Sequence, residues 1–459
     1  MHIRLFFSCV LALLLGMGTA SAQTKVVKLE GIDAELYVAD NIEAAGRTVV
    51  LVPGGGYNHI AKAHEGEGWV PFFTQKGISV AIVRYRLPEG DGQRSLADVR
   101  TAFRQIHDQA AALGLNPNGV GIMGFSAGGH LASAYTNIEY RELKPAFCIL
   151  FYPVIRLDIK QHLGMAKKFL GDTPSKAQLL AWSTNRMVTM DTPRTFLCTA
   201  DDDPTIDPAN ALAYYEALRQ RHVPATLKVY GDGGHGFGCR ETFPYHDQMM
   251  QDLSIWLDHT AVPGPKAVKV ACIGNSITYG SKLKFRNTES YPAQMQQMLG
   301  KDYWVKNYGV SGTTMTRSAN PWTGREEWPL LRQWQPAIVF IKLGTNDVQP
   351  RYWKGTEQYT ADYQALIDTL RQLPTHPRIV LCLPATSYRE VNHLDADLVS
   401  NVIPAIRRLA KKNHLDIIDL HTLTAGHAAD FPDKLHPSAA MDALIAGALV
   451  DYLKQHQGH

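Results

Sequence analysis

Two serines in this 459-residue sequence lie in short turns after apolar, strand-like runs, where a hydroxyl could act as a nucleophile. Ser126 lies within GFSAGG (124–129), and Ser276 lies within ACIGNSITYG (271–280). A serine hydroxyl is a poor nucleophile at neutral pH, so it needs a nearby base and a group that orients this base. We therefore searched for a histidine and a carboxylate for each serine, and for N–H groups that would stabilise an oxyanion.

The candidate partners of Ser126 follow it in the order Ser…Asp…His, which is known from serine hydrolases. His235 lies in the glycine-rich run GDGGHGFG, directly after the predicted strand ATLKVY. Three consecutive aspartates (201–203) follow the preceding strand, TFLCTA. Asp203, which precedes a proline, is the predicted orienting acid, and Asp202 is the alternative because the register among the three stays open.

The candidate oxyanion donors of the first site lie in PGGGY (53–57), at the end of an early strand. Gly55 or Gly56 could direct its N–H at the site, with the N–H of Ala127 opposite. A phosphate-binding loop is disfavoured here because no Lys-Ser/Thr pair follows the glycines.

Ser276 lies just after the predicted strand 268–274 and starts a predicted helix, where the positive end of the helix dipole favours a developing negative charge. Two further loops, NYGVSG (307–312) and GTND (344–347), also follow strands. Asp433 and His436 are three residues apart, so a short loop can present a base and a carboxylate to one site.

Apolar strands alternate with amphipathic helical segments along the whole chain, which predicts parallel sheets buried on both faces and an α/β fold class. The length exceeds what one hydrophobic core usually organises. We predict a first domain over 23–260, a linker over 261–266 around Pro-Gly-Pro, and a second domain over 267–459. The predicted strands are 48–53, 79–85, 120–125, 146–152, 195–200 and 225–230, then 268–274, 303–309, 337–344, 378–384 and 415–420.

The first 22 residues have the pattern of a cleavable signal peptide, with a basic start, an apolar run and Ala-Ser-Ala at the end. The apolar run is too short for a membrane anchor, so a secreted or periplasmic location is expected. The formal net charge is +3 and long basic runs are absent, so neither nucleic acid nor an anionic membrane is an expected partner. Five widely spaced cysteines remain after cleavage, a pattern that indicates neither a disulfide framework nor a zinc site.

Five motifs of the first domain, in order, resemble the α/β-hydrolase family of secreted acetyl xylan esterases and related carbohydrate deacetylases, over residues 30–259. This resemblance implies that Ser126 is the nucleophile, His235 the base and an aspartate at 202 or 203 the orienting acid. His64 and Glu65 are interpreted as structural residues. The motifs are PGGGY, HEGEGW (64–69), YRLPEG (85–90), GFSAGGHLAS (124–133) and GGHGFG (233–238).

The four blocks of the second half resemble the SGNH (GDSL-type) hydrolases, with a flavodoxin-like three-layer fold, over residues 266–457. The family pattern implies Ser276 as nucleophile, His436 as base and Asp433 as its orienter. It also implies three oxyanion donors, which are the Ser276 N–H, the Gly309 N–H and the Asn346 side chain. Asn275 departs from the aspartate that is usual before this serine, but an asparagine can still bond to the backbone of the turn.

Together these features predict a tandem serine esterase that removes acetyl groups from a polysaccharide such as acetylated xylan, through acyl-enzyme intermediates and without a metal or cofactor. The second domain also resembles sialate and rhamnogalacturonan acetylesterases. Three alternatives stay open: a lipase or lysophospholipase, a peptidase, and a catalytically silent sugar-binding second domain. In the last case the candidates for stacking on sugars would be Trp322, Trp328, Trp334 and Trp353, although two or three of them are expected to be core residues instead.

Overall fold

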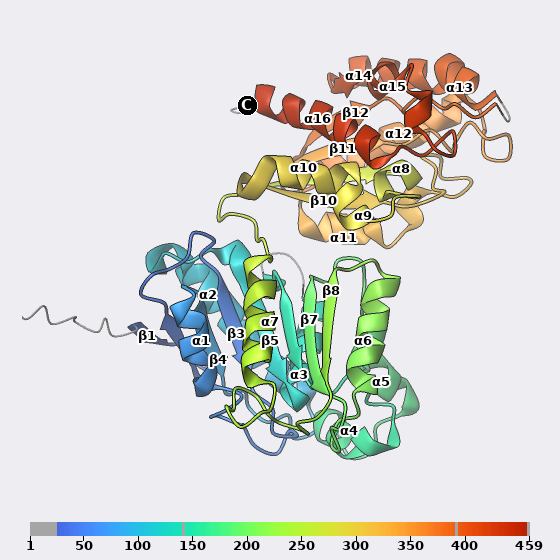
Figure 1. Cartoon of the computed structure of the whole chain (residues 1–459). Coiled ribbons are helices and arrows are strands. Elements are labelled where there is room, and N and C mark those ends of the chain that lie inside the picture. Colours follow the sequence, from blue (N-terminus) through green and yellow to red (C-terminus); the bar gives the residue numbers. More distant parts are fainter. Residues whose placement is uncertain (1–24, 140–142, 391–392, 457–459) are drawn as a thin grey trace, which may run out of the picture.

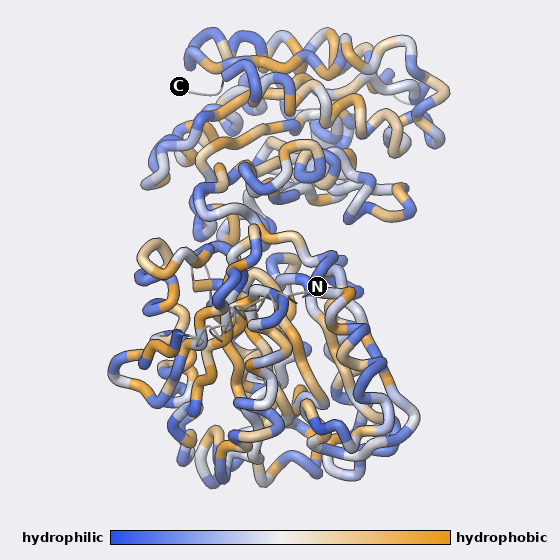
Figure 2. Tube along the Cα trace, turned by 60° about the vertical axis from the view of Figure 1, so that its left-hand side comes forward, coloured by the Kyte–Doolittle hydropathy of each residue, from blue (hydrophilic) through white to orange (hydrophobic). Residues whose placement is uncertain are grey.

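The structure is a computed structural model that describes residues 25–139, 143–390 and 393–456, so the predicted signal peptide lies outside the described residues. Two α/β domains, each with its own sheet, are stacked end to end (Figure 1). Hydrophobic residues follow the strands through the interior of both domains, and hydrophilic residues gather on loops and outer helix faces (Figure 2). The predicted α/β class is confirmed.

The first sheet has the strand order β1-β2-β4-β3-β5-β6-β7-β8 and is parallel except for β1 and β2. All six strands predicted for this domain are present. The antiparallel pair β1–β2 was not predicted, because neither short strand forms a continuous apolar run: β1 is largely exposed and β2 alternates in burial. The strands are β1 (Lys25–Lys28), β2 (Ala34–Val38), β3 (Thr48–Val52), β4 (Ser79–Val83), β5 (Val120–Phe125), β6 (Cys148–Phe151), β7 (Thr195–Ala200) and β8 (Ala225–Tyr230).

Helices cover both faces of this sheet, as continuous apolar strands require. The helices α2 (Gly92–Leu113), α3 (Ser126–Ile138) and α6 (Ala209–Gln220) pack on one face. The helices α1 (Val70–Gln75) and α7 (His246–Asp258) pack on the other. Two further helices, α4 (Leu163–Leu170) and α5 (Lys176–Ala181), lie beyond the carboxyl ends of the strands (Figure 1).

The second sheet is entirely parallel, with the order β10-β9-β11-β12-β13. Counted within the domain this is 2-1-3-4-5, the flavodoxin-like order, which confirms the predicted fold. The strands are β9 (Val268–Gly274), β10 (Tyr303–Gly309), β11 (Ile338–Lys342), β12 (Arg378–Cys382) and β13 (Asp416–Ile418). The helices are α8 (Ser276–Tyr279), α9 (Arg286–Glu289), α10 (Tyr291–Leu299), α11 (Glu327–Trp334), α12 (Thr356–Arg371), α13 (Leu394–Asp397), α14 (Ile403–Asn413), α15 (Leu420–Thr424) and α16 (Ala439–Gln455).

The chain passes from the first sheet to the second between α7 and β9, the interval in which the sequence predicts the linker. Hydrogen bonds fasten this passage to both domains. Asn116 Nδ2 donates to the Pro263 carbonyl at 2.8 Å and Asn118 Nδ2 to the Gly264 carbonyl at 2.7 Å. On the other side, Gly264 N–H donates to the Lys301 carbonyl at 2.7 Å. The linker is therefore not a free tether.

The four tryptophans proposed for sugar stacking are part of the second hydrophobic core. Trp322 and Trp334 are buried, which confirms the expectation that two or three of the four are core residues. Trp328 and Trp353 are half-buried and pack against the same cluster. A ring that is buried on both faces cannot stack on a sugar, so Trp322 and Trp334 serve the fold.

The five cysteines among the described residues are free thiols, and four of them are buried on strands. Within the described residues, no helix is long and apolar enough to cross a membrane.

Candidate active sites

Ser126 lies at the turn between β5 and α3, in a backbone conformation that L-residues rarely adopt (φ +51°). The turn is tight because the first residues of α3 pack directly against the backbone at the end of β3. A Cβ at Gly128 would lie 2.2 Å from the Pro53 carbonyl oxygen, so only glycine fits there. This strained turn lifts the serine hydroxyl above the carboxyl edge of the sheet, as the sequence predicts.

The structure brings the three predicted side chains of the first site into one hydrogen-bonded row. His235 Nε2 lies 2.9 Å from Ser126 Oγ, and His235 Nδ1 lies 2.7 Å from Asp203 Oδ2. The carboxylate of Asp203 is held in turn, because its Oδ1 accepts the N–H groups of Thr205 and Ile206 at 2.8 and 2.9 Å. The Asp203 side chain is fully buried, which keeps water from competing for these bonds.

The alternative acid, Asp202, has a different role. Its carboxylate accepts the N–H groups of Gly233 and Gly234, at 3.2 and 2.8 Å. Asp202 therefore braces the loop that carries His235, and Asp203 is the residue that contacts the imidazole.

The predicted oxyanion glycines line the same cavity as the serine. This cavity has a volume of about 410 Å³, and its walls include Gly55, Gly56, Ser126 and His235. Gly55 has φ +125°, and a Cβ there would lie 2.0 Å from the His59 carbonyl oxygen, so the loop needs glycine. Ala127 is the second residue of α3, where the N–H has no acceptor within the helix and can face a ligand.

Glu65 connects the oxyanion loop to the histidine loop. Its carboxylate accepts the Gly54 N–H at 2.8 Å and the Tyr152 hydroxyl at 2.9 Å. Tyr152 Oη in turn accepts the N–H of Gly238 at 2.9 Å. Burial raises the pKa of Glu65, although the hydrogen bonds from Tyr152 and Gly54 act in the opposite direction. These contacts agree with the structural interpretation of Glu65. No sequence motif marked Tyr152, which directly follows the apolar strand β6.

The second site repeats the row on a different fold. His436 Nε2 lies 2.9 Å from Ser276 Oγ, and His436 Nδ1 lies 2.7 Å from Asp433 Oδ2. Asp433 Oδ1 also accepts the backbone N–H of His436 at 2.7 Å and that of Leu435 at 3.1 Å. Two residues of one loop thus supply the base and its carboxylate, as their spacing predicts.

The carboxylate of Asp433 is stabilised in its charged form. Burial acts to raise the pKa of Asp433. This effect is outweighed by the hydrogen bonds from the backbone and side chain of His436, the charge of His436 and the hydrogen bond from the Leu435 N–H, which hold the pKa of Asp433 well below its usual range.

This shift predicts a pH-dependent contribution of Asp433 to stability. A carboxyl whose pKa is lower in the folded state than its unfolded value of about 3.9 stabilises the fold above that value. The contribution is lost as the pH falls through the folded pKa. Asp433→Asn should therefore lower the free energy of unfolding at pH 7 and change it less as the pH falls below about 4. Urea unfolding at several pH values checks this, and an equal loss at every pH would contradict it.

The remaining predicted residues of the second site lie at or after the carboxyl ends of β9, β10 and β11, which are neighbours in the sheet, and one of them differs from the prediction. Asn346 Nδ2 donates to the Thr313 carbonyl at 2.8 Å, which fixes the amide in the loop after β11. The Gly309 N–H, expected to face the oxyanion, donates instead to Asn307 Oδ1 at 2.9 Å. Asn275 Oδ1 accepts the Ile277 N–H at 3.2 Å, so this asparagine supports the serine turn as the sequence suggests.

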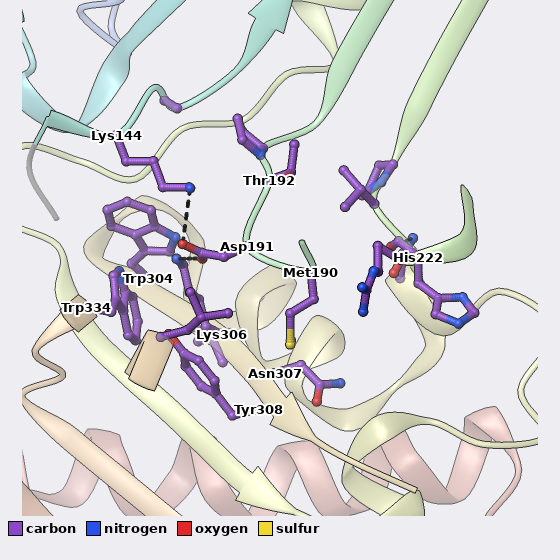
Figure 3. Close-up of a pocket in the computed structure, with 18 of the residues that line it drawn as sticks. Lys144, Met190, Asp191, Thr192, His222, Trp304, Lys306, Asn307, Tyr308 and Trp334 are labelled. Atoms are coloured by element: carbon purple, nitrogen blue, oxygen red, sulfur yellow. Dashed lines mark hydrogen bonds and ion pairs between the residues drawn. The ribbon is translucent and has the colours of Figure 1, made fainter. Parts of the chain in front are cut away.

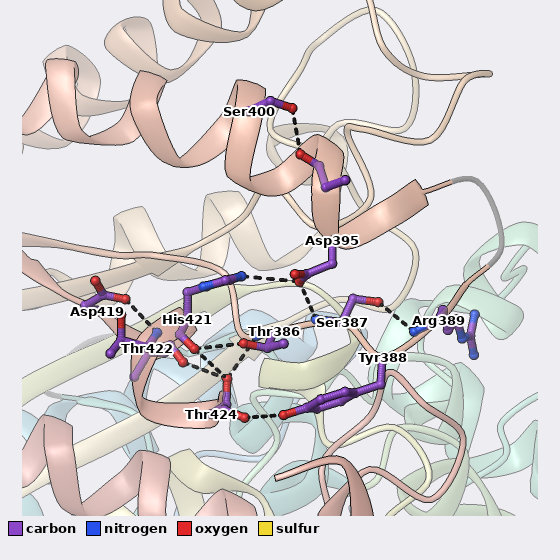
Figure 4. Close-up of polar contacts among 12 residues, drawn as sticks. Thr386, Ser387, Tyr388, Arg389, Asp395, Ser400, Asp419, His421, Thr422 and Thr424 are labelled. Atoms are coloured by element: carbon purple, nitrogen blue, oxygen red, sulfur yellow. Dashed lines mark hydrogen bonds and ion pairs between the residues drawn. The ribbon is translucent and has the colours of Figure 1, made fainter. Parts of the chain in front are cut away.

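A polar network beside β12 supports the histidine loop of the second site (Figure 4). The Thr386 N–H donates to Thr424 Oγ1 at 2.9 Å, and the Tyr388 hydroxyl donates to the Thr424 carbonyl at 2.6 Å. These bonds place Arg389, whose guanidinium donates to Asp433 Oδ2 at 3.1 Å. Sequence reasoning missed Arg389, because it belongs to no motif and reaches the site only through the fold.

Comparison with known proteins matches each half of the chain to a different family. Residues 49–238 match the model of the alpha/beta hydrolase fold, and residues 272–444 match the GDSL-like Lipase/Acylhydrolase family. An acetylxylan esterase of Xylanibacter ruminicola is 36% identical over 479 residues, which cover 98% of this chain and 100% of the relative.

Two partial relatives match only one part of the chain. The ethyl acetate hydrolase of Pseudomonas putida is 26% identical over 221 residues, 43% of this chain and 68% of that protein. The solved structure of an acetyl ester-xyloside bifunctional hydrolase from Caldicellulosiruptor lactoaceticus is 29% identical with a TM-score of 0.46, and covers 50% of this chain and 89% of that chain. On the full-length match, the chain belongs to the same carbohydrate esterase family as the Xylanibacter ruminicola acetylxylan esterase, and it is a serine ester hydrolase with an α/β-hydrolase domain followed by a GDSL-like domain.

Proposed function

We propose that the protein is a secreted enzyme that removes O-acetyl groups from plant polysaccharides such as acetylated xylan, at two separate Ser-His-Asp sites. The observation that carries this proposal is the repeated row of hydrogen bonds, at 2.9 and 2.7 Å, in both domains. The full-length relative, an acetylxylan esterase, supports the substrate class. The predicted signal peptide supports export, which such a polymer requires.

At the first site, His235 Nε2 accepts the hydroxyl proton while Ser126 Oγ bonds to the ester carbonyl carbon. The N–H groups of the Gly55–Gly56 loop and of Ala127 stabilise the resulting oxyanion. Collapse of this intermediate breaks the bond to the sugar oxygen, which leaves with the proton from His235. In the second half of the reaction, His235 takes a proton from water, which attacks the carbonyl carbon of the acetyl-serine. The bond to Ser126 Oγ breaks, His235 returns the proton to Oγ, and acetate is released.

At the second site, Ser276 and His436 carry out the same steps, and Asp433 holds the imidazole in the tautomer that accepts at Nε2. The oxyanion donors are the Asn346 side chain, the Ser276 N–H at the start of α8 and the Gly309 N–H. The last of these can serve only after it turns from Asn307 Oδ1 to the substrate. We therefore expect the second oxyanion hole to be completed when the ester binds.

Covalent labelling tests this proposal directly. A fluorophosphonate that reacts with activated serines should add two labels per wild-type chain, as measured by intact mass. Ser126→Ala and Ser276→Ala should each take up one label, and the double variant none. Acetate release from acetylated xylan should persist in both single variants and disappear in the double variant.

Each other outcome supports a named alternative. A single label on the wild-type chain indicates one silent domain. Faster hydrolysis of octanoyl than of acetyl esters indicates a lipase-type enzyme, and cleavage of a peptide amide indicates a peptidase.

A further inference from the structure

The two domains meet at the amino ends of β7 and β8, around a cavity of about 280 Å³ lined by residues of both (Figure 3). Asp191 of the first domain lies here between two ammonium groups. Lys144 Nζ of the same domain lies 3.5 Å from its carboxylate, and Lys306 on β10 of the second domain donates to it. Burial acts to raise the pKa of Asp191, but the two ammonium groups outweigh it and lower this pKa. The first domain is therefore joined to β10 by a partly buried ion pair between Asp191 and Lys306.

A second contact lies beside this one and reaches the catalytic helix. His222, in the loop between α6 and β8, places its ring edge-on to the ring of Tyr279, with centroids 5.4 Å apart and an interplanar angle of 86°. The His222 carbonyl also accepts a hydrogen bond from Asn287 Nδ2 at 3.0 Å. Tyr279 is the last residue of α8, the helix that Ser276 starts.

Tyr279 is also held from within its own domain. The guanidinium of Arg286 lies 3.9 Å from the centroid of the Tyr279 ring, and Arg286 Nε donates to the Tyr279 carbonyl at 2.8 Å. Asn307, which follows Lys306 on β10, donates from Nδ2 to the Thr278 carbonyl at 2.7 Å. The tyrosine is thus fixed by the second domain on one side and by His222 of the first domain on another.

The helix α8 depends on such contacts because it has only four residues. A single helical turn is unstable on its own, since forming it fixes several dihedral angles for very few hydrogen bonds. The position of Ser276 Oγ, 2.9 Å from His436 Nε2, therefore depends on what holds the far end of this turn.

We infer that His222 of the first domain is a positioning residue for the second serine site. By supporting Tyr279 it fixes α8, and with it the distance between the Ser276 hydroxyl and the imidazole of His436. This inference rests on the proposed function of the second site. A misplacement of about 1 Å in a reacting group can cost on the order of 10²-fold in rate, so a distant contact of this kind can matter for turnover.

The test uses the full chain with Ser126→Ala, so that only the second site turns over a chromogenic acetate. His222→Ala should lower kcat by about tenfold and leave KM nearly unchanged, because the substrate does not touch His222. His222→Phe keeps an aromatic ring against Tyr279 and should restore most of kcat.

Arg221→Ala is the matched control. Arg221 precedes His222 and also forms an interdomain ion pair, at 2.7 Å, but its partner Glu326 adjoins α11 and not α8. Its kcat should stay within about twofold of the parent. Equal kcat losses in His222→Ala and Arg221→Ala, or no recovery in His222→Phe, would overturn the inference.

Hydrogen exchange separates this inference from the proposed function. His222→Ala should speed amide exchange at residues 277–280, and Arg221→Ala should not. If Ser126→Ala has no more activity than the double serine variant, the proposed second site is wrong. Unchanged exchange in His222→Ala overturns the positioning role whether or not that site is active.

Discussion

Asp203→Asn should lower kcat at the first site by about 10⁴-fold, the scale expected when the base is held in the wrong tautomer. The Thr205 and Ile206 N–H groups would bind the amide oxygen, because they now bind Asp203 Oδ1 at 2.8 and 2.9 Å. The amide NH₂ would then point at His235 Nδ1 and donate to it. An imidazole that accepts at Nδ1 carries its proton on Nε2, where it cannot take the serine proton.

Asp202→Asn is the matched control for this prediction. Asp202 accepts only the Gly233 and Gly234 N–H groups in the histidine loop, and an amide oxygen can still accept from one of them. We expect a loss of about tenfold or less. Both variants are measured as kcat for a chromogenic acetate in the Ser276→Ala chain. Similar losses in the two variants would contradict the assignment of Asp203 as the orienting acid.

The second large effect is expected at the oxyanion hole of the second domain. Asn346→Ala, in the Ser126→Ala chain, should lower kcat by about 10²–10³-fold. The amide is locked for this task, because Nδ2 donates one hydrogen to the Thr313 carbonyl at 2.8 Å and Oδ1 accepts from Gln349 at 3.1 Å. Within the described chain the other Nδ2 hydrogen has no protein acceptor, which leaves it for the substrate oxyanion.

Two further variants separate donation from packing. Asn346→Asp keeps the side-chain volume but removes both donated hydrogens, so it should be at least as impaired as Asn346→Ala. Gln349→Ala removes only the bond that orients the amide, so a loss of about tenfold or less is expected. Nearly full activity in Asn346→Asp would show that the amide N–H does not act on the oxyanion.

The layered fold and most candidate site residues could be predicted because they follow from short-range patterns. A continuous apolar run followed by a helix indicates a parallel strand, and a serine, glycine or asparagine at its carboxyl end lies at the edge where such sites form. The sequence predicted Asp203 as the orienting acid, and the structure places it on His235. Asp202 stayed open as the alternative, because the register among the three aspartates depends on how one loop turns after β7.

These short-range patterns could not predict contacts between segments that are distant in the sequence. Arg389 reaches Asp433 across 44 residues of sequence, and no motif marks it. The tryptophans show a related limit: two or three of the four were expected in the core, but only the structure identifies Trp322 and Trp334 as buried ones. A side chain's type is visible in the sequence, but the direction in which it points is set by packing.

The fastened linker has a consequence for how the protein is made. Asn116 and Asn118 precede their acceptors, Pro263 and Gly264, by 147 and 146 residues. The ribosome therefore synthesises the residues that bind the linker well before the linker itself. At roughly 5–20 residues per second, the chain from 267 onward needs on the order of ten seconds or more to emerge. The earlier lobe thus has time to mature, and the later one assembles against a surface that is already in place.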